Sequence, residues 1–390
     1  MTAHKPRVAV IGISGYGRVH LELARECRDR GELDLVAATV INPADEAANV
    51  TELRAHGCAI YPDYVSMLRA HEGGIDLCLV PTGIHWHARM TIEALRAGAN
   101  VLVEKPLCCS TSELIAIQDA ERKAGRFVAV GFQDLYDPGA AWLKSELARG
   151  VIGGIRSIKV LGLWPRPRSY FLRNEWAGRL MFKGQPVYDS PLSNAFAHFV
   201  MLGLYFSGSR GGADVANGRL QAQLFRAHEI ESFDTAVVRM RTAAGVGLWF
   251  GVSHACREVS EPEIVIEGTE GEARWRYERD AWWQVPDGDR NVRQLHDANG
   301  ARRCMMSTTL RHLSDSSAEI CTTSIAGAHT RFIEALHRDC PIVPFKRESV
   351  MWTGDNGFES SIPYVPGLEP ALRESFLAKS MLAETSFAGV

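Results

Sequence analysis

The chain has 390 residues, of which 46% are apolar and 23% charged, and its formal net charge is −3. This length predicts two domains or one large one, with the composition of an ordinary globular protein. The small charge gives no reason to expect nucleic acid or a membrane surface as a partner. No apolar run approaches the roughly 18 residues that a membrane helix needs.

The cysteines and the N-terminus indicate the compartment. The nine cysteines are scattered, without a C-x-x-C pair or a metal-ligand spacing. We therefore expect reduced thiols and no metal site. The N-terminus passes into a strand-like segment by Arg7, so we expect no signal peptide and a cytoplasmic location.

Residues 7–131 alternate short apolar runs with segments of helical periodicity. This alternation predicts a parallel sheet with helices on both faces, in the doubly wound arrangement. We therefore predict an N-terminal Rossmann domain over residues 1–131. Its expected strands are RVAVIG, DLVAATVI, IDLCLV, NVLVEKP and RFVAVGF.

The pattern changes after Phe132. An apolar helix is expected over residues 191–207, and several period-two segments follow without intervening helices. Consecutive strands predict a mostly antiparallel sheet in an α+β domain, which we expect to span residues 132–390 and to bind substrate and mediate oligomerisation. Residues 279–325 are polar and irregular, which predicts a surface loop.

A glycine-rich turn separates the first expected strand from the first helix. Gly12 and Gly17 occupy the outer positions of a G-x-G-x-x-G pattern, and Ser14 takes the middle one. Such a turn gives a pyrophosphate close access to the helix N-terminus. An ordinary strand-to-helix turn is the alternative. The residues expected to bind dinucleotide here are Gly12, Ser14, Gly15, Tyr16 and Gly17.

The end of the second expected strand bears on the choice of dinucleotide. NAD-binding proteins commonly present Asp or Glu there, whereas this chain has Asn42. No Arg or Lys stands between Val36 and Leu53 to pair with a 2′-phosphate. A buried dianion without a cation is costly. We therefore expect NAD or NADP, with NAD favoured and Asn42 as the ribose partner.

The expected strand at residues 100–103 ends in Glu104-Lys105-Pro106. Doubly wound folds bind ligands at the carboxyl edge of the sheet, where Lys105 would face a substrate oxygen. Proline stiffens the turn, and a cis Lys105–Pro106 bond is compatible with this position. A solvated surface lysine is the alternative.

These features together resemble the glucose–fructose oxidoreductase and inositol dehydrogenase family, also called Gfo/Idh/MocA. Thr82 and His87 match that family's T-P-x-x-x-H segment, with Gly83 in place of proline. The VGFQDLYDP segment resembles the family's passage into the second domain, with Leu135 where arginine is common, and NGFESS at 356–361 resembles its C-terminal signature. The resemblance adds further expected cofactor residues, which are Pro81, Thr82, His87, Glu104, Lys105 and Gln133.

The family also carries a D-x-x-x-H pattern in its second domain, and here the register gives Asn194-x-x-x-His198. With Ser190 as N-cap and Pro191 as first helical residue, the two side chains would share one helix face. Asn in place of Asp cannot stabilise an imidazolium by charge, and Asp189 could compensate. A satisfied core histidine is the alternative for His198.

Residues 163–180 concentrate arginines and aromatic rings. Rings can cover the apolar surface of a sugar while guanidinium groups hold its oxygens. A loop that braces a subunit interface is the alternative. The expected substrate contacts in this stretch are Arg166, Arg168, Tyr170, Asn174 and Trp176, beside Lys105, Asn194 and His198.

The resemblance implies an NAD(P)-dependent dehydrogenase acting on a secondary carbinol or ketone of a sugar, sugar acid or polyol. His198 would be the general base, Lys105 would polarise the oxygen, and Asn194 with Asp189 would orient the substrate. The alternatives are a cofactor-recycling lyase or glycosidase of the same fold, and a non-catalytic sugar or dinucleotide sensor. The resemblance also implies a homodimer or homotetramer formed through the second-domain sheet.

Overall fold

The computed structural model describes residues 5–208, 220–354 and 358–387. The chain divides into two compact units, of which the first comprises residues 1–136 and 298–326 and the second residues 137–297 and 327–390. Within the described ranges, no helix is both long and apolar enough to span a membrane.

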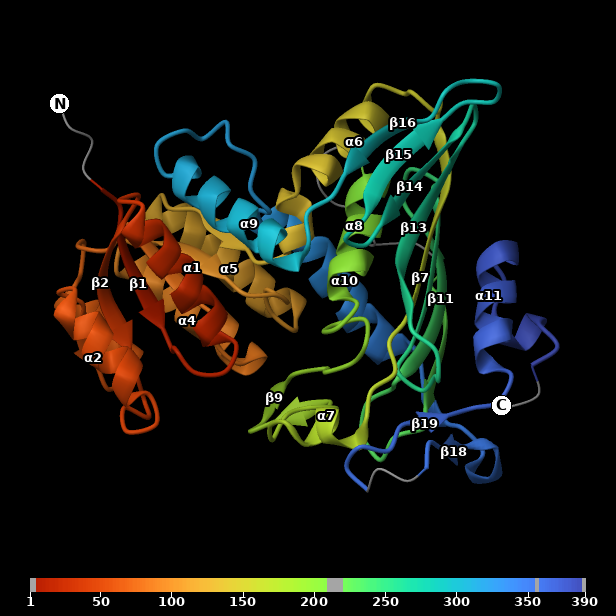
Figure 1. Cartoon of the computed structure of the whole chain (residues 1–390), viewed down its shortest axis with the longest axis horizontal. Coiled ribbons are helices and arrows are strands. Elements are labelled where there is room, and N and C mark those ends of the chain that lie inside the picture. Colours follow the sequence, from red (N-terminus) through yellow and green to blue (C-terminus); the bar gives the residue numbers. More distant parts are fainter. Residues whose placement is uncertain (1–4, 209–219, 355–357, 388–390) are drawn as a thin grey trace. The chain divides into compact units, whose positions relative to one another are not determined.

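The first unit is built on a six-stranded parallel sheet with the order β3-β2-β1-β4-β5-β6 (Figure 1). The order reverses between β1 and β4, and ligands of open α/β sheets bind at the carboxyl ends of such neighbours. The predicted doubly wound Rossmann fold is confirmed. Its strands are β1 Arg7–Ile11, β2 Asp34–Thr39, β3 Ala59–Tyr61, β4 Leu77–Val80, β5 Asn100–Val103 and β6 Val128–Val130, and its helices include α1 Gly17–Asp29, α2 Ala47–Ala55, α3 Tyr64–Ala70, α4 Ile84–Arg96 and α5 Thr111–Ala124.

A late segment of the chain returns to this first unit. Helix α9, Ala298–His312, packs against α1 and against the short 3-10 helix η1, Gln133–Tyr136. Beyond α9, the backbone N–H of Val130 in β6 donates to the carbonyl of Cys321 (2.8 Å). The segment therefore covers the edge of the sheet at β6. Residues 298–326 fall within the range outlined for the second domain but belong to the first compact unit.

The prediction of a surface loop over residues 279–325 was wrong. The segment contains strands β15, Asp280–Gln284, and β16, Asn291–Gln294, followed by α9. The four residues of β16 are all exposed, and α9 buries few side chains, among them Met305 and Met306. Such polar elements lack a strong hydrophobic period, and pairing and packing with distant segments determine their structure.

The second unit contains a nine-stranded sheet with the order β16-β15-β14-β13-β7-β12-β11-β10-β17. Two neighbouring pairs, β7 with β12 and β10 with β17, are parallel, and the others are antiparallel. The predicted mostly antiparallel sheet is confirmed. Its remaining strands are β7 Ile155–Leu163, β10 Gln221–Arg226, β11 Thr235–Arg241, β12 Gly247–Ser253, β13 Ser260–Gly268, β14 Glu272–Arg276 and β17 Ile342–Pro344.

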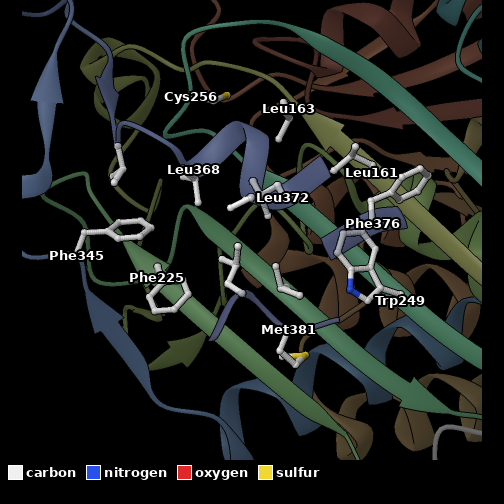
Figure 2. Packing of buried hydrophobic residues seen from close by; sticks show 14 of the residues in the cluster. Leu161, Leu163, Phe225, Trp249, Cys256, Phe345, Leu368, Leu372, Phe376 and Met381 are labelled. Carbon is white, nitrogen blue, oxygen red and sulfur yellow. The ribbon is translucent and has the colours of Figure 1, made fainter. Parts of the chain in front are cut away.

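Helices cover both faces of this sheet at its centre. Helix α8, Ala197–Ser207, packs on β7 and β13, and α11, Leu368–Ala378, packs on β7 and β12 from the opposite side (Figure 1). Successive side chains of a strand point to opposite faces of the sheet, so the same strands can pack against both helices. Phe250 lies against α8 at Gly203, whereas its neighbour Trp249 joins the apolar cluster beneath α11 with Leu161 and Phe376 (Figure 2).

The other elements of the chain are short or lie outside the two sheets. They are α6 Pro138–Ala148, α7 Arg168–Leu172, α10 Thr323–Asp339, β8 Met181–Phe182, β9 Gln185–Pro186, β18 Met351–Trp352, β19 Pro363–Tyr364, η2 Arg347–Ser349 and η3 Leu382–Glu384.

Helix α8 begins later than predicted. The helix starts at Ala197, and the preceding residues from Pro191 form turns rather than helix. Ser190 accepts from the N–H of Ser193 with its hydroxyl, as an N-cap would, but the next bonds have mixed spacing, such as Phe196 N to Pro191 O (2.8 Å). Ser and Asn side chains that bond locally compete with helical hydrogen bonds. The proposed helix start at Ser190 and Pro191 was therefore wrong.

Candidate active site

The glycine-rich turn of the first unit has the geometry that a dinucleotide requires. Gly12 and Gly15 have φ angles of 88° and 56°, which other residues rarely adopt. A Cβ at Gly17 would lie 2.5 Å from the carbonyl oxygen of Gly12 and 3.7 Å from Pro81. Gly17 is therefore required so that α1 can start directly against the turn, and the turn lies beside the end of β4.

The residues at the end of β2 form a connected polar group. The hydroxyl of Ser14 donates to the side-chain oxygen of Asn42 (3.0 Å), so these two predicted cofactor residues are in contact. Glu46, only 4% exposed, accepts from Asn49 (2.6 Å) and Arg18 (3.0 Å). The hydrogen bond from Asn49, followed by those from Ser14 and Arg18, lowers the pKa of Glu46 although burial opposes that shift. Sequence analysis did not identify this buried carboxylate.

His87 joins the loops that follow β4 and β5. The ring is 1% exposed, with Nδ1 2.7 Å from the carbonyl oxygen of Pro106 and Nε2 3.0 Å from that of Thr82. Burial lowers the pKa of His87, although the two carbonyl contacts oppose the shift. The bond between Lys105 and Pro106 is cis. His87 therefore positions the loop that carries Lys105, and it has no ring nitrogen left for a ligand.

Glu104 lies beneath the same loop and is 5% exposed. One carboxylate oxygen accepts the backbone N–H of Lys105 (3.1 Å), and the other lies 2.8 Å from Nε2 of His20 in α1. Burial opposes ionisation, but the hydrogen bond with His20, with Lys105 nearby, lowers the pKa of Glu104. Within the described part of the chain, Nδ1 of His20 has no hydrogen-bond partner. Glu104 therefore fixes the main chain of Lys105 and is itself held by the first helix.

Two further side chains lie at this end of the first unit. Arg302 of α9 donates to the hydroxyl of Tyr16 (3.3 Å), whose ring is 42% exposed. Gln133 is buried, and its side-chain oxygen has no partner among the residues that the structure describes. A buried acceptor without a partner is costly unless a bound amide or hydroxyl group donates to it. The role of Arg302 was missed because α9 was not predicted.

Asp189 organises the corresponding part of the second unit. This carboxylate is 2% exposed and accepts from the N–H of Gly178 (2.7 Å), from Arg173 (3.5 Å) and from the side-chain amide of Asn194 (2.8 Å). Asn194 lies in the turn before α8, and His198 lies in the first turn of that helix. Asp189 is thus a buried anchor for Asn194, and both of its oxygens are occupied.

The arginine-rich stretch forms an alternating stack of rings and guanidinium groups, which we call the guanidinium ladder. The Arg166 guanidinium lies 5.6 Å from the Trp164 ring and 4.8 Å from the Tyr170 ring. The Arg173 guanidinium lies 3.9 Å from Tyr170 and 5.5 Å from Trp176. The ladder connects to Asp189 through Arg173, so it is continuous with the Asn194 network.

Two predicted substrate residues lie outside the guanidinium ladder. Arg168 stacks 3.9 Å from the rings of both Trp352 and Phe358. The side-chain oxygen of Asn174 accepts the backbone N–H of Trp176 (3.1 Å), so it stabilises a local turn. Both residues therefore have contacts within the protein that account for their positions.

The C-terminal NGFESS segment lies partly outside the described residues, because 355–357 are not described. The described remainder pairs with α7. The backbone N–H groups of Arg168 and Ser169 donate to the carbonyls of Ser361 (3.1 Å) and Glu359 (2.9 Å). This segment thus supports the start of α7 in the second unit.

Comparison with known proteins agrees with the first unit. Residues 6–132 match the family model described as "Oxidoreductase family, NAD-binding Rossmann fold". The chain is 35% identical over 145 residues to the inositol 2-dehydrogenase of Klebsiella pneumoniae (strain 342), which covers 37% of this chain and 42% of that protein. It is 32% identical over 148 residues to the inositol 2-dehydrogenase/D-chiro-inositol 3-dehydrogenase of Halalkalibacterium halodurans, covering 38% and 41%. The match thus spans about two fifths of these relatives.

Solved structures resemble a larger part of the chain. The WlbA dehydrogenase of Bordetella pertussis, in complex with NADH and UDP-GlcNAcA, matches with a TM-score of 0.67 and 20% identity over 86% of this chain and 96% of that one. A 3-ketoreductase from Actinomadura kijaniata, in complex with NADP and TDP-benzene, matches with a TM-score of 0.65 and 18% identity over 88% and 100%. These likenesses establish a shared fold.

The family model covers the glycine-rich turn, the T-x-x-x-x-H segment at Thr82 to His87 and the Glu104-Lys105-Pro106 loop. These segments follow β1, β4 and β5 at the carboxyl edge of the sheet, where doubly wound folds bind their ligands. Residues 6–132 of this chain thus resemble the Gfo/Idh/MocA family of oxidoreductases.

Proposed function

We propose that this chain is an NAD(P)-dependent oxidoreductase that interconverts a secondary carbinol and the matching ketone of a sugar, sugar acid or polyol. The observation that carries the proposal is the turn from Gly12 to Gly17, in which Gly17 leaves no room for a side chain against the carbonyl of Gly12. Such a turn leaves backbone N–H groups accessible to a pyrophosphate. The relatives that are named as inositol dehydrogenases support a polyol or sugar as substrate.

The first unit supplies the groups that would hold the dinucleotide. The turn would hold the pyrophosphate, Asn42 the ribose, and Gln133 with Thr82 the end nearest Lys105. The buried carboxylate of Glu46 beside Ser14 favours NAD, because a 2′-phosphate there would meet a like charge. Arg18 could pair with such a phosphate only by leaving Glu46. When bound, the cofactor accepts or donates the hydride.

The protein's own residues would handle the substrate oxygen and its proton. We assign His198 as the group that takes or returns the hydroxyl proton, since imidazole titrates near neutral pH. Lys105 would stabilise negative charge on that oxygen. Glu104 and His87 would position Lys105 through its main chain, and Asp189 would orient Asn194. Asp189 thus acts through Asn194 rather than as a direct substrate contact.

A cytoplasmic location and a homo-oligomer remain part of this proposal. A sheet-mediated interface in the second unit would have to use strands away from α11, because α11 already covers β7 and β12 on that face. Light scattering of the purified protein would give its oligomeric state.

The experiment that tests the proposal follows absorbance at 340 nm while a panel of sugars, sugar acids and polyols is added with NAD, NADH, NADP or NADPH. Turnover of one compound supports the dehydrogenase. Stabilisation by a dinucleotide without net turnover favours the cofactor-recycling lyase or the sensor, and product analysis separates these two.

The turn offers a matched pair of variants for the same experiment. Gly17→Ala forces a Cβ against the Gly12 carbonyl, whereas at Gly154 the nearest atom to a new Cβ would be 3.9 Å away. We expect Gly17→Ala to weaken dinucleotide binding about 100-fold, because α1 must move away from the turn. Gly154→Ala should bind normally. Unchanged binding by Gly17→Ala would contradict the assignment of the turn.

A further inference from the structure

We propose that Arg166 binds an anionic group of the substrate, a carboxylate or a phosphate, so that the natural substrate is an acidic sugar rather than a neutral polyol. This inference rests on the proposed function. It depends on three features of Arg166 in the second unit, which are its stacking, its lack of a counter-ion and its connection to Asn194.

Stacking fixes the orientation of the Arg166 guanidinium. Its neighbours in the guanidinium ladder, Trp164 and Tyr170, contact the cation through their rings at 5.6 Å and 4.8 Å. Cation–π contacts of this kind favour the faces of the guanidinium plane and leave its N–H edge for hydrogen bonds. That edge is the side through which arginine binds carboxylates and phosphates bidentately.

The charge of Arg166 is not balanced within the protein, in contrast to its neighbours. Arg173 pairs with Asp189 (3.5 Å) and Arg168 with Glu229 (3.2 Å). Within the described residues, Arg166 has no ion pair, and its buried Nε has no hydrogen-bond acceptor. A partly buried cation without an acceptor is costly unless a ligand supplies one.

The side chain is also not needed to hold its own segment in place. The backbone N–H of Arg166 donates to the carbonyl of His254 (3.2 Å), and its carbonyl oxygen accepts from Nε2 of His228 (3.0 Å). Both histidines are buried, and His228 also contacts Asp234 (2.8 Å). These bonds fix the main chain independently of the guanidinium, which leaves the guanidinium for recognition.

The guanidinium ladder connects Arg166 with the residues assigned to the substrate. Tyr170 contacts both Arg166 and Arg173, and Arg173 reaches Asp189, which accepts from Asn194. An anion at Arg166 would therefore lie in the same connected network as Asn194. A sugar that carries an acidic group at one end and the reacting hydroxyl at the other has the chemistry that this network recognises.

The test compares D-glucose, D-glucuronate and D-glucose 6-phosphate as probes by calorimetry on the full chain with saturating NAD. The two acidic probes distinguish a carboxylate site from a phosphate site. We expect at least one of them to bind at least about tenfold more tightly than D-glucose. Arg166→Gln should weaken the binding of that acidic probe about 30-fold. Binding of D-glucose should change less than about twofold in the same variant.

Two variants control for folding and for general charge. Arg166→Lys keeps the charge but loses the planar fork, so part of the preference for the acidic probe should remain. Arg290 also stacks on a ring, that of Trp282 at 4.0 Å, but it is exposed on the β15–β16 hairpin, and Arg290→Gln should behave as wild type. Thermal unfolding of each variant checks that it is folded.

The outcomes separate this inference from the proposed function. If neither acidic probe binds at least about tenfold more tightly than D-glucose, or if Arg166→Gln leaves their affinity unchanged, the inference is overturned. Turnover of a neutral sugar would then leave the dehydrogenase standing. If no dinucleotide stabilises the wild type, the proposed function fails first, and a preference for acidic probes that depends on Arg166 would remain as an anion site of unknown purpose.

Discussion

Each unit contains one buried carboxylate that supports a residue assigned to catalysis, and the two are built on the same plan. Glu104 accepts the N–H of Lys105 with one oxygen and meets the ring of His20 with the other. Asp189 accepts the N–H of Gly178 with one oxygen and the amide of Asn194 with the other. In both, one oxygen accepts from a backbone N–H group and the other contacts a side-chain nitrogen.

The two carboxylates differ in the side chains that contact them, because only Asp189 accepts a hydrogen bond from an arginine. Asp189 also meets Arg173, whereas the ring beside Glu104 is a histidine that can change its tautomer. Glu104 acts on the main chain of its neighbour Lys105, and Asp189 acts on a side chain five positions away. The comparison teaches that the first carboxylate shapes a loop, while the second holds a charged network that includes the guanidinium ladder. Four predictions test this comparison.

The largest effect is expected at Lys105, the residue that Glu104 supports. Lys105→Ala removes the charge assigned to the substrate oxygen, so kcat should fall about 10³-fold while dinucleotide affinity changes little. Steady-state kinetics and thermal shift with NAD measure the two quantities. Lys123→Ala, at an exposed position on α5, is the control. A loss below about tenfold would contradict the role of Lys105.

Amide replacements compare the two carboxylates directly. Asp189→Asn leaves Arg173 without its counter-charge and should lower the free energy of unfolding by about 1–2 kcal/mol, since Arg173 is partly exposed. Glu104→Gln should cost under about 1 kcal/mol, because His20 can accept from the new amide through its other tautomer. Urea unfolding measures both. The reverse order would show that the ring of His20 is held as a cation.

A smaller, pH-dependent effect is expected where the chain departs from the family's aspartate. Asn194→Asp places a second carboxylate about 2.8 Å from Asp189. Like charges raise the pKa of one of them, so stability should fall by about 1 kcal/mol as pH rises from 5 to 8. The double variant Asp189→Asn with Asn194→Asp should lose this pH dependence. A single variant that is equally stable at both pH values would contradict the expectation.

The smallest effect near neutral pH concerns His254, whose Nδ1 lies 2.8 Å from the backbone carbonyl oxygen of Trp164 in the guanidinium ladder. Burial lowers the pKa of His254 to about 3. The unfolded chain gains this proton below its ordinary pKa, about 6.5, while the folded chain does not, so stability falls as pH decreases. The cost reaches about 1.4 kcal/mol at pH 5.5. His254→Gln should remove this loss of stability at low pH, so its midpoint temperature should fall less between pH 7 and pH 5.5 than that of the wild type. An equal fall in both proteins would contradict the expectation.

Much of the fold could be predicted from the sequence because the hydrophobic pattern changes at the boundaries of its elements. Continuous apolar runs predicted the parallel strands of the first unit, and period-two segments predicted the sheet of the second. The start of α8 and the whole of α9 were predicted wrongly. In both, the segment near Ser190 or Ala298 is rich in polar side chains. Contacts with other parts of the protein determine its structure, and the hydrophobic period of the sequence does not reveal them.

The candidate site was predictable only where residue types are constrained by the backbone. Gly17 follows from local geometry, because a side chain there would meet the carbonyl of Gly12. The supporting contacts join residues that are far apart in the chain. The sequence separation is 84 for His20 and Glu104, and 286 for Tyr16 and Arg302. A histidine in the first turn of an amphipathic helix was the one visible signal for His20.

The central claim is that the first unit binds a nicotinamide dinucleotide, and thermal unfolding of the wild-type chain with NAD, NADH, NADP and NADPH tests it most directly. A ligand that binds only the folded state raises the midpoint temperature. The account predicts a clear rise with NAD or NADH, a smaller one with the phosphorylated forms, and none for Gly17→Ala. An unchanged midpoint with all four dinucleotides would contradict it.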